Sequence, residues 1–139
     1  MASWRGRAGD AAGAAEALTE LLPVVERVLG PEHPDALAAR HSLAFWRGRA
    51  GDAAGAAEAL TELLPVVERE LGPEHPDTLA TRHNLAFWRG HAGNAAGAAA
   101  AFAELLPVRE RVQGPDHPDT RATWTALDYW RKAAASRRT

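Results

Sequence analysis

Six histidines are the residues of this chain best suited to chemistry, because imidazole can bind a metal ion or transfer a proton near neutral pH. Three of them, His33, His75 and His117, recur at a constant interval of 42 positions in nearly the same short segment. Glu74 and Asp77 lie beside His75, but this spacing matches no zinc-binding pattern, and ligands from different copies of the segment would have to converge between units. We therefore predict no metal and no cofactor, and expect these histidines to cap or pack turns.

Catalytic motifs are missing from the rest of the sequence. It contains no phosphate-binding loop, no nucleophile elbow, no HExxH motif and no pair of carboxylates placed to separate two pKa values. Cysteine is absent, so disulfides and thiolate metal sites are excluded. We predict that the chain is not an enzyme.

Arginine also recurs with the same period, at Arg5, Arg47, Arg89 and Arg131. Such a column could attract an acidic ligand, but cations near the ends of helices also interact favourably with the helix dipole, and we favour this second interpretation. The formal net charge of −2 and the pI near 6.3 argue against nucleic-acid binding. No apolar run approaches the length that crosses a bilayer, so we expect no membrane contact and a cytoplasmic location.

An internal repeat determines the organisation of the chain. Trp4, Trp46, Trp88 and Trp130 follow one another at intervals of 42 positions, and 4–45 differs from 46–87 at only four positions. The third copy, 88–129, has diverged further but keeps every glycine and proline in register. Repetition of this kind predicts a stack of similar structural units.

Glycine and proline divide each unit into two helices, which we call helix A and helix B. In the second and third copies, Gly72 suits the residue after a helix and Pro76 suits a first turn, so helix A is expected from about 76 to 91. Gly93 ends it, and Asn94 can cap helix B, which is expected to reach about Gln113.

Two residues of helix B are unusual for a helix interior. Gly55 costs roughly 1 kcal/mol relative to alanine, and its recurrence as Gly13 and Gly97 suggests a close approach of two helices. Pro65, which recurs as Pro23 and Pro107, removes a backbone hydrogen bond. We expect a kink at this proline or a break into two shorter helices.

Several short segments carry a family resemblance. They are the linker Leu71-Gly72-Pro73-Glu74-His75-Pro76-Asp77, the segment Asn84-Leu85-Ala86, the turn Ala92-Gly93-Asn94, and Ala98 with Phe102. Together they resemble the tetratricopeptide repeat (TPR) family, in the 42-residue form similar to that of kinesin light chains and of the sensor arrays of bacterial NTPase switch proteins. The resemblance implies an all-α, right-handed TPR-like solenoid of antiparallel helix pairs, with about six helices in the order B-A-B-A-B-A.

The expected domain organisation is a single array over residues 1–135. It contains the repeats 4–45, 46–87 and 88–129 and a terminal helix to about 135, and residues 136–139 form a frayed tail.

The resemblance also implies a function, because helix A lines the concave surface of such arrays and commonly holds a peptide. We therefore predict a protein-protein interaction scaffold that binds a peptide or protein partner. The positions that match this surface are His41, Phe45, Arg49, His83, Asn84, Phe87, His91 and Tyr129. The aromatic members could instead simply pack between helices.

The two ends of the repeat differ in character. At the far end, Arg109, Gln113 and Arg121 replace Val67, Leu71 and Leu79, which is typical of a polar terminal cap. The first helix B instead carries an apolar face with Leu22, Val25 and Leu29. This face favours two alternatives to peptide binding: a structural or self-assembly module that forms a homodimer through this helix, or the terminal sensor-array fragment of a larger signalling NTPase.

Overall fold

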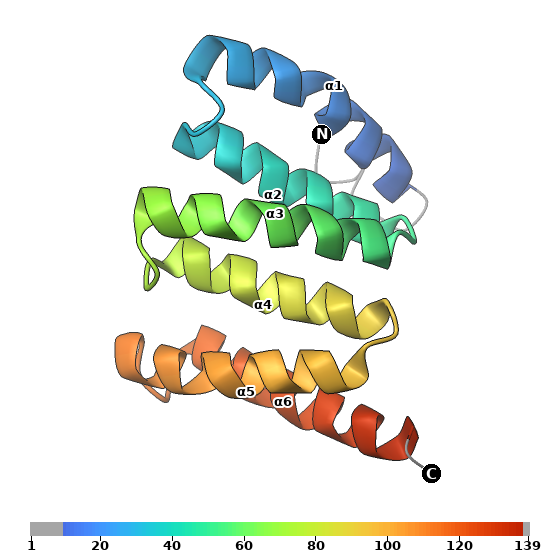
Figure 1. The fold of residues 1–139 in the computed structure, drawn as a ribbon, viewed down its shortest axis with the longest axis vertical. Coiled ribbons are helices and arrows are strands. Elements are labelled where there is room, and N and C mark those ends of the chain that lie inside the picture. Colours follow the sequence, from blue (N-terminus) through green and yellow to red (C-terminus); the bar gives the residue numbers. More distant parts are fainter. Residues whose placement is uncertain (1–9, 138–139) are drawn as a thin grey trace.

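The computed structural model of the chain describes residues 10–137, which form six α-helices and no strand. Figure 1 shows them stacked in chain order, with α1 and α6 at opposite ends. The six helices are α1 (Ala11–Leu29), α2 (Pro34–Arg49), α3 (Ala53–Leu71), α4 (Pro76–His91), α5 (Ala95–Val112) and α6 (Pro118–Arg137). Helix B of the repeat is α1, α3 or α5, and helix A is α2, α4 or α6. The predicted all-α solenoid with the order B-A-B-A-B-A is confirmed.

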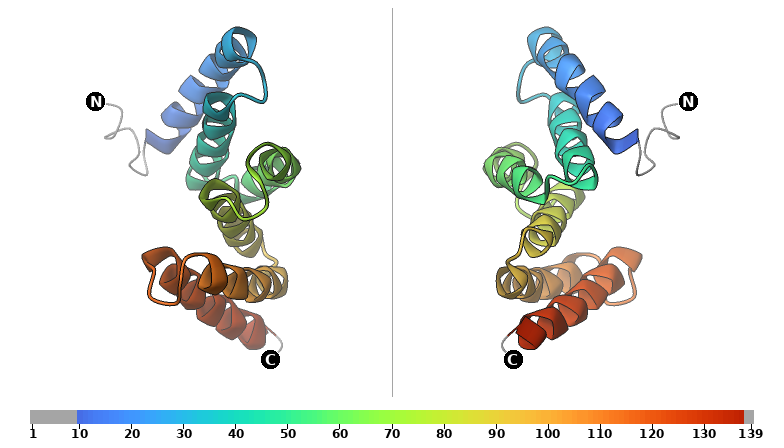
Figure 2. Two further views of the ribbon diagram at one scale, coloured as in Figure 1. Left: turned by 90° about the vertical axis from the view of Figure 1, so that its left-hand side faces the viewer. Right: turned by 90° about the vertical axis from the view of Figure 1, so that its right-hand side faces the viewer.

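Packing in the stack is local. Each helix packs against the helix before it and the helix after it, with smaller contacts between α2 and α4 and between α4 and α6. Figure 2 shows that the stack curves, because α1 and α6 lie on the same side of α3. A chain built in this way presents long, continuous faces made of one helix from every unit.

The turns between helices are built by the residues that the repeat singled out. The histidine before each helix A caps it: Nδ1 of His33, His75 and His117 each accepts a hydrogen bond from a backbone N–H two residues later. Oδ1 of Asp52 and of Asn94 caps α3 and α5 by accepting a hydrogen bond from a backbone N–H three residues later. The prediction that these histidines serve the turns is confirmed.

Glycine explains why the last helix is longer than its counterparts. Gly51 and Gly93 follow α2 and α4 with φ angles of 106° and 108°, a conformation that favours glycine. The matching position at the end of the chain is Ala135, which has no such freedom, and α6 continues past it to Arg137. The terminal helix therefore extends two residues beyond the expected end near 135, while 138–139 lie outside the described residues.

The explanation expected for the glycine inside helix B is wrong. A Cβ on Gly55 would collide with the side chain of Asp52, and one on Gly97 would collide with Asn94. The capping side chain lies over the first turn of its own helix, so the glycine makes room for the cap. It does not mark an approach between two helices.

The prolines of helix B do not break it. The helices α1, α3 and α5 run without interruption through Pro23, Pro65 and Pro107. All three prolines are exposed, as is Thr61, whose carbonyl loses its helical partner to the Pro65 ring. Water can reach such a carbonyl, which lowers the cost of the missing hydrogen bond.

Close contact between helices occurs in helix A. A Cβ on Gly48 would lie 2.5 Å from the ring of Trp88, and one on Gly90 would lie 2.5 Å from the ring of Trp130. Both tryptophans are buried, within two successive core clusters centred on α3 and α5. Each indole ring therefore lies directly on the backbone of the preceding helix A, which fixes the spacing between units.

Candidate functional site: two hollows between the A helices

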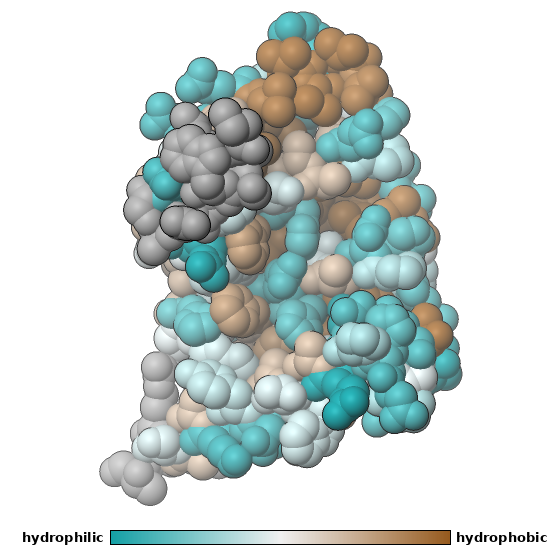
Figure 3. All heavy atoms as spheres, turned by 180° about the vertical axis from the view of Figure 1, so that it is seen from behind, coloured by the Kyte–Doolittle hydropathy of each residue, from teal (hydrophilic) through white to brown (hydrophobic). Residues whose placement is uncertain are grey.

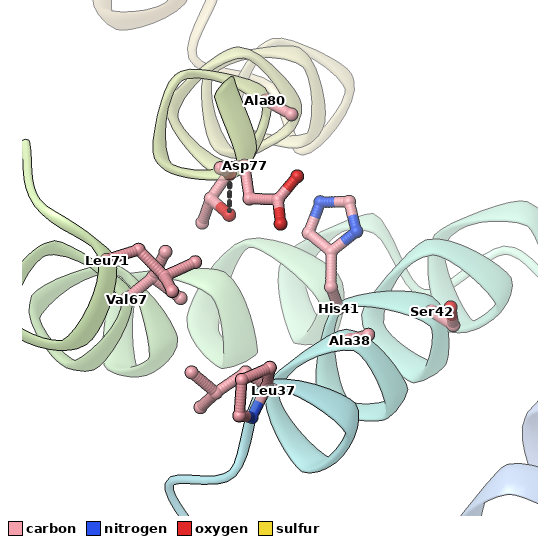
Figure 4. Close-up of a pocket in the computed structure, with 10 residues that line it drawn as sticks. Leu37, Ala38, His41, Ser42, Val67, Leu71, Asp77 and Ala80 are labelled. Atoms are coloured by element: carbon pink, nitrogen blue, oxygen red, sulfur yellow. Dashed lines mark hydrogen bonds between the residues drawn. The ribbon is translucent and has the colours of Figure 1, made fainter. Parts of the chain in front are cut away.

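A hollow of about 190 Å³ lies between α2 and α4, with α3 behind it; we call it the first hollow. Figure 4 shows His41 of α2 and Asp77 of α4 facing each other across it, with Val67 and Leu71 projecting from α3. Its lining residues are Pro34, Leu37, Ala38, His41, Ser42, Val67, Leu71, Asp77, Ala80 and Thr81. The hollow thus combines an apolar wall with polar groups along its rim.

A second hollow, of about 200 Å³, repeats the first between α4 and α6. Each of its lining residues lies 42 positions after a residue that lines the first hollow: Ala80, His83, Asn84, Arg109, Asp119 and Ala122. The repeat therefore places two versions of one site side by side along the A helices. They differ most where Val67 in the first becomes Arg109 in the second.

Hydrogen bonds tie the A helices together along this row. Asn84 Nδ2 lies 2.9 Å from His41 Nε2, so the amide donates to the unprotonated ring nitrogen. His83 Nδ1 lies 3.3 Å from Thr123 Oγ1, which itself donates to the carbonyl of Asp119. The Thr123 hydroxyl can then accept from His83, which places the His83 ring proton on Nδ1.

Both histidines of the row are held in their uncharged form. Burial lowers the pKa of His41, although nearby Asp77 acts in the opposite direction. Burial and then the charge of Arg109 lower the pKa of His83 to about 4, against an opposing effect of Asp119. At neutral pH the row therefore presents neutral donors and acceptors, which suit peptide groups better than charged ligands.

Arg109 is buried, with only 4% of its surface exposed. Its Nη1 donates to the carbonyl of Asp119 at 2.9 Å, while its Nε has no hydrogen-bond partner among the described residues. Burial lowers the pKa of its guanidinium, with an opposing effect of Asp119. The sequence interpretation placed Arg109 among the polar residues of a terminal cap, and this is wrong for Arg109, because the residue lies inside the α5–α6 contact.

The aromatic members of the predicted site pack more than they project. Phe45 and Phe87 are half-buried against the core, each in an edge-to-face contact with the tryptophan that follows it. Tyr129 differs, because 57% of its surface is exposed. The packing interpretation thus describes the two phenylalanines, and only the tyrosine projects from the surface.

The remaining two predicted residues lie at the far ends of the A helices. Arg49 is exposed and its guanidinium lies 5.9 Å from the centre of the Phe45 ring. His91 is also exposed and contacts the rings of Phe87 and Trp130. The structure therefore brings His41, His83 and Asn84 to the hollows and places the other five along or beyond them.

Sequence reasoning missed the residues that shape the hollows. In the sequence, Val67 and Leu71 stand out only as the apolar counterparts of Arg109 and Gln113, and Asp77 only as a neighbour of His75. Their shared signal is the 42-residue offset, since Asp77 and Asp119 stand in the same place relative to His41 and His83.

Two further kinds of feature are absent from the described part of the chain. Within residues 10–137 no three His, Asp or Glu side chains gather in a way that could hold a metal ion. None of the described helices is both long and apolar enough to cross a bilayer.

Comparison with known proteins agrees with the fold and the repeat. The family model of the tetratricopeptide repeat matches residues 6–35, 36–77 and 78–119, which is most of the chain. The chain belongs to the tetratricopeptide repeat family. Arrays of this TPR family generally serve as protein-interaction scaffolds and are generally non-catalytic.

Solved structures show the same TPR architecture. A protein of Podosopora anserina, described as a kinesin light chain with nearly identical TPR-like repeats, superposes with a TM-score of 0.87 at 25% identity over 96% of this chain. A single-substitution variant of that protein superposes equally well. The chain spans 64% and 63% of the lengths of these two structures. No curated protein matches the chain.

Proposed function

We propose that the chain binds an extended peptide or an extended segment of a partner protein along the face formed by α2, α4 and α6. The observation that carries this proposal is the pair of hollows related by the 42-residue repeat. A peptide lying across the A helices would meet a histidine and an aspartate at equivalent positions twice, once at each hollow.

The chemistry of the hollows indicates what such a segment would offer. The first hollow has an apolar wall made of Leu37, Val67 and Leu71, which suits an aliphatic or small aromatic side chain. The neutral imidazoles of His41 and His83 suit the N–H and C=O groups of a peptide backbone. Asp77 is exposed at the rim and would favour a basic residue of the ligand nearby.

Ala38 lines the first hollow and Ala122 lines the second, and both are exposed helix residues. A substitution of Ala38 therefore tests binding at the first hollow. A random dodecapeptide library displayed on phage is selected against the full chain, and the selected peptides are then measured by calorimetry. We expect Ala38→Glu to weaken their binding by about tenfold or more, because the longer side chain fills the first hollow with a charge.

The matched control is Ala100→Glu, at an exposed position of α5 that lines neither hollow. It should leave the affinity of the selected peptides unchanged. A library that yields no binder, or peptides that respond equally to Ala38→Glu and Ala100→Glu, would contradict the proposal.

A further inference from the structure

The first helix exposes a patch of large apolar side chains. Leu21, Val24 and Val28 have 50%, 42% and 70% of their surfaces exposed. In Figure 3 the apolar surface at one end of the molecule gathers over α1. The main packing partner of α1 within residues 10–137 is α2, which lies on its other side and covers Leu22 and Val25 only partly.

Comparison with α3 shows what kind of element suits this face. The two 19-residue helices have the same sequence except at one position, where Val28 in α1 corresponds to Glu70 in α3. Leu63, the counterpart of Leu21, is only 1% exposed because α3 is packed between α2 and α4. The face that holds Leu21 is therefore one that this protein covers with a helix.

The spacing on α1 is that of a helix-helix seam. Its members alternate three and four residues apart, at Ala14, Ala17, Leu21, Val24 and Val28; we call them the α1 seam. Apolar residues spaced in this way form a straight line along one side of a helix, which packs against a second helix of similar pattern. This line differs from the predicted Leu22, Val25 and Leu29, of which the first two are half-buried toward α2.

The opposite end of the molecule is a poor partner for this seam. In α4, Leu79 and Ala86 are buried in the core shared with α5, and the matching residues of α6 are Arg121 and Asp128. Stacking α1 of one molecule on α6 of another would bury these charged side chains against leucine and alanine, at a high cost in desolvation. Head-to-tail growth is therefore disfavoured.

Charged residues beside the seam favour a second copy of α1 in antiparallel orientation. Glu20 and Arg27 are both exposed, flank the same edge of the seam, and have no ion-pair partner among the described residues. In an antiparallel pair, positions on the same edge face each other across the seam, so Glu20 of each copy lies beside Arg27 of the other.

A parallel pair would lack this match of charges. There, residues on one edge of the seam face residues on the opposite edge of the other copy, so Glu20 would face Val25. Arg27 would face the position of Glu32, which lies beyond the end of α1 and already pairs with Arg69 of α3. The antiparallel orientation is therefore the one that the charges support.

From these observations we propose that the chain forms a symmetric dimer in which the α1 seams of two copies pack antiparallel. Leu21 and Val24 of one copy lie against Val24 and Leu21 of the other, and Val28 lies over Ala17. The two Glu20–Arg27 pairs flank this contact on one edge. A seam of so few side chains is small for a protein interface, so we expect a dimer whose population depends on concentration over the micromolar range or above.

Sedimentation equilibrium of the full chain over a wide range of concentrations tests the proposal. We expect a monomer-dimer equilibrium that Val28→Glu weakens by about tenfold or more, because a symmetric contact loses the side chain twice. This substitution gives α1 the sequence of α3, which is helical in this protein, so the variant should fold. Circular dichroism checks that it does.

The matched control is Val112→Glu, at the same repeat position of α5 and 39% exposed, which should leave the dimer unchanged. Charge reversal tests the orientation: E20R and R27E should each weaken the dimer, and the double variant E20R/R27E should restore it. A strict monomer at high concentration, a dimer insensitive to Val28→Glu, or a double variant no tighter than the single ones would overturn the proposal.

Discussion

The two hollows lie at equivalent places in the repeat and have different interiors. The first, between α2 and α4, is closed by Val67, which is 3% exposed, and the second, between α4 and α6, by Arg109, which is 4% exposed. Nearly the same backbone thus accommodates an apolar side chain in one place and a buried cation in the other. The difference shows that the repeat fixes where a side chain lies, while the single residue decides the electrostatics of the hollow.

The largest effect is expected from placing a cation in the first hollow. Val67→Arg removes a buried valine from the core around α3 and brings a guanidinium into its place, facing the helix start at Asp77. We expect the free energy of unfolding to fall by about 2–4 kcal/mol, because burying an incompletely paired charge outweighs any new hydrogen bond. Urea unfolding followed by circular dichroism measures it. Stability equal to that of the unmodified chain would show that both hollows accept a cation equally well.

The acid dependence of stability tests the uncharged state of His83, the histidine of the second hollow. His83 has a folded-state pKa of about 4 against an ordinary value of 6.5, so the unfolded chain binds the proton more readily. Protonation of His83 therefore favours the unfolded chain. The free energy of unfolding keeps its full value above pH 6.5 and falls as the pH drops toward about 4, by about 3 kcal/mol in total. Unfolding measured across this range should show the loss, and His83→Gln should reduce it. A His83→Gln variant with an unchanged acid profile would contradict the assignment.

Alanine substitutions at Gly48 and Gly90 allow the two junctions between successive A helices to be compared. Gly48→Ala forces a methyl group against the Trp88 ring, and we expect a net loss of about 1–2 kcal/mol after the gain in helix propensity. Gly90→Ala meets Trp130 in the same way, but α6 packs mainly against α5 and can shift outward, so its loss should be smaller. Thermal unfolding of both variants, each with and without replacement of the facing tryptophan by leucine, gives the coupling free energy between the glycine position and that tryptophan. Equal losses at the two junctions would argue against this difference.

The sequence predicted the helices well because their ends are marked by residues with local conformational preferences. Pro76 and Gly93 bracket α4, and the expected range 76–91 agrees with Pro76–His91 in the structure. Local signals of this kind act within a few residues and can be read from one sequence. The family resemblance then supplied the order in which the helices stack.

The interior of the hollows could not be predicted in the same way. Whether a position on helix B faces solvent or a neighbour depends on how the next helix is rotated, and no local signal carries this information. Arg109 was therefore interpreted as part of a polar cap although it is buried, whereas Arg121, interpreted in the same way, is exposed. The repeat offset did contain the answer, since Val67 and Arg109 occupy equivalent positions.

The smallest effect is expected when the second hollow is made like the first. Arg109→Val removes a buried cation whose Nε has no partner among the described residues. The substitution strands no other group, because Thr123 Oγ1 still donates to the Asp119 carbonyl and the Asp119 side chain is exposed. Replacing a buried charge by a well-packed apolar side chain is often neutral or stabilising, so we expect a gain of between zero and about 1 kcal/mol.

The same variant sharpens the electrostatic comparison. Without the guanidinium, the pKa of His83 should rise toward that of His41, because burial alone then opposes protonation. Titration of the imidazole resonances by NMR measures this shift directly. A stable Arg109→Val variant in which the pKa of His83 stays near 4 would mean that burial accounts for the whole depression and that the two hollows differ in shape more than in charge.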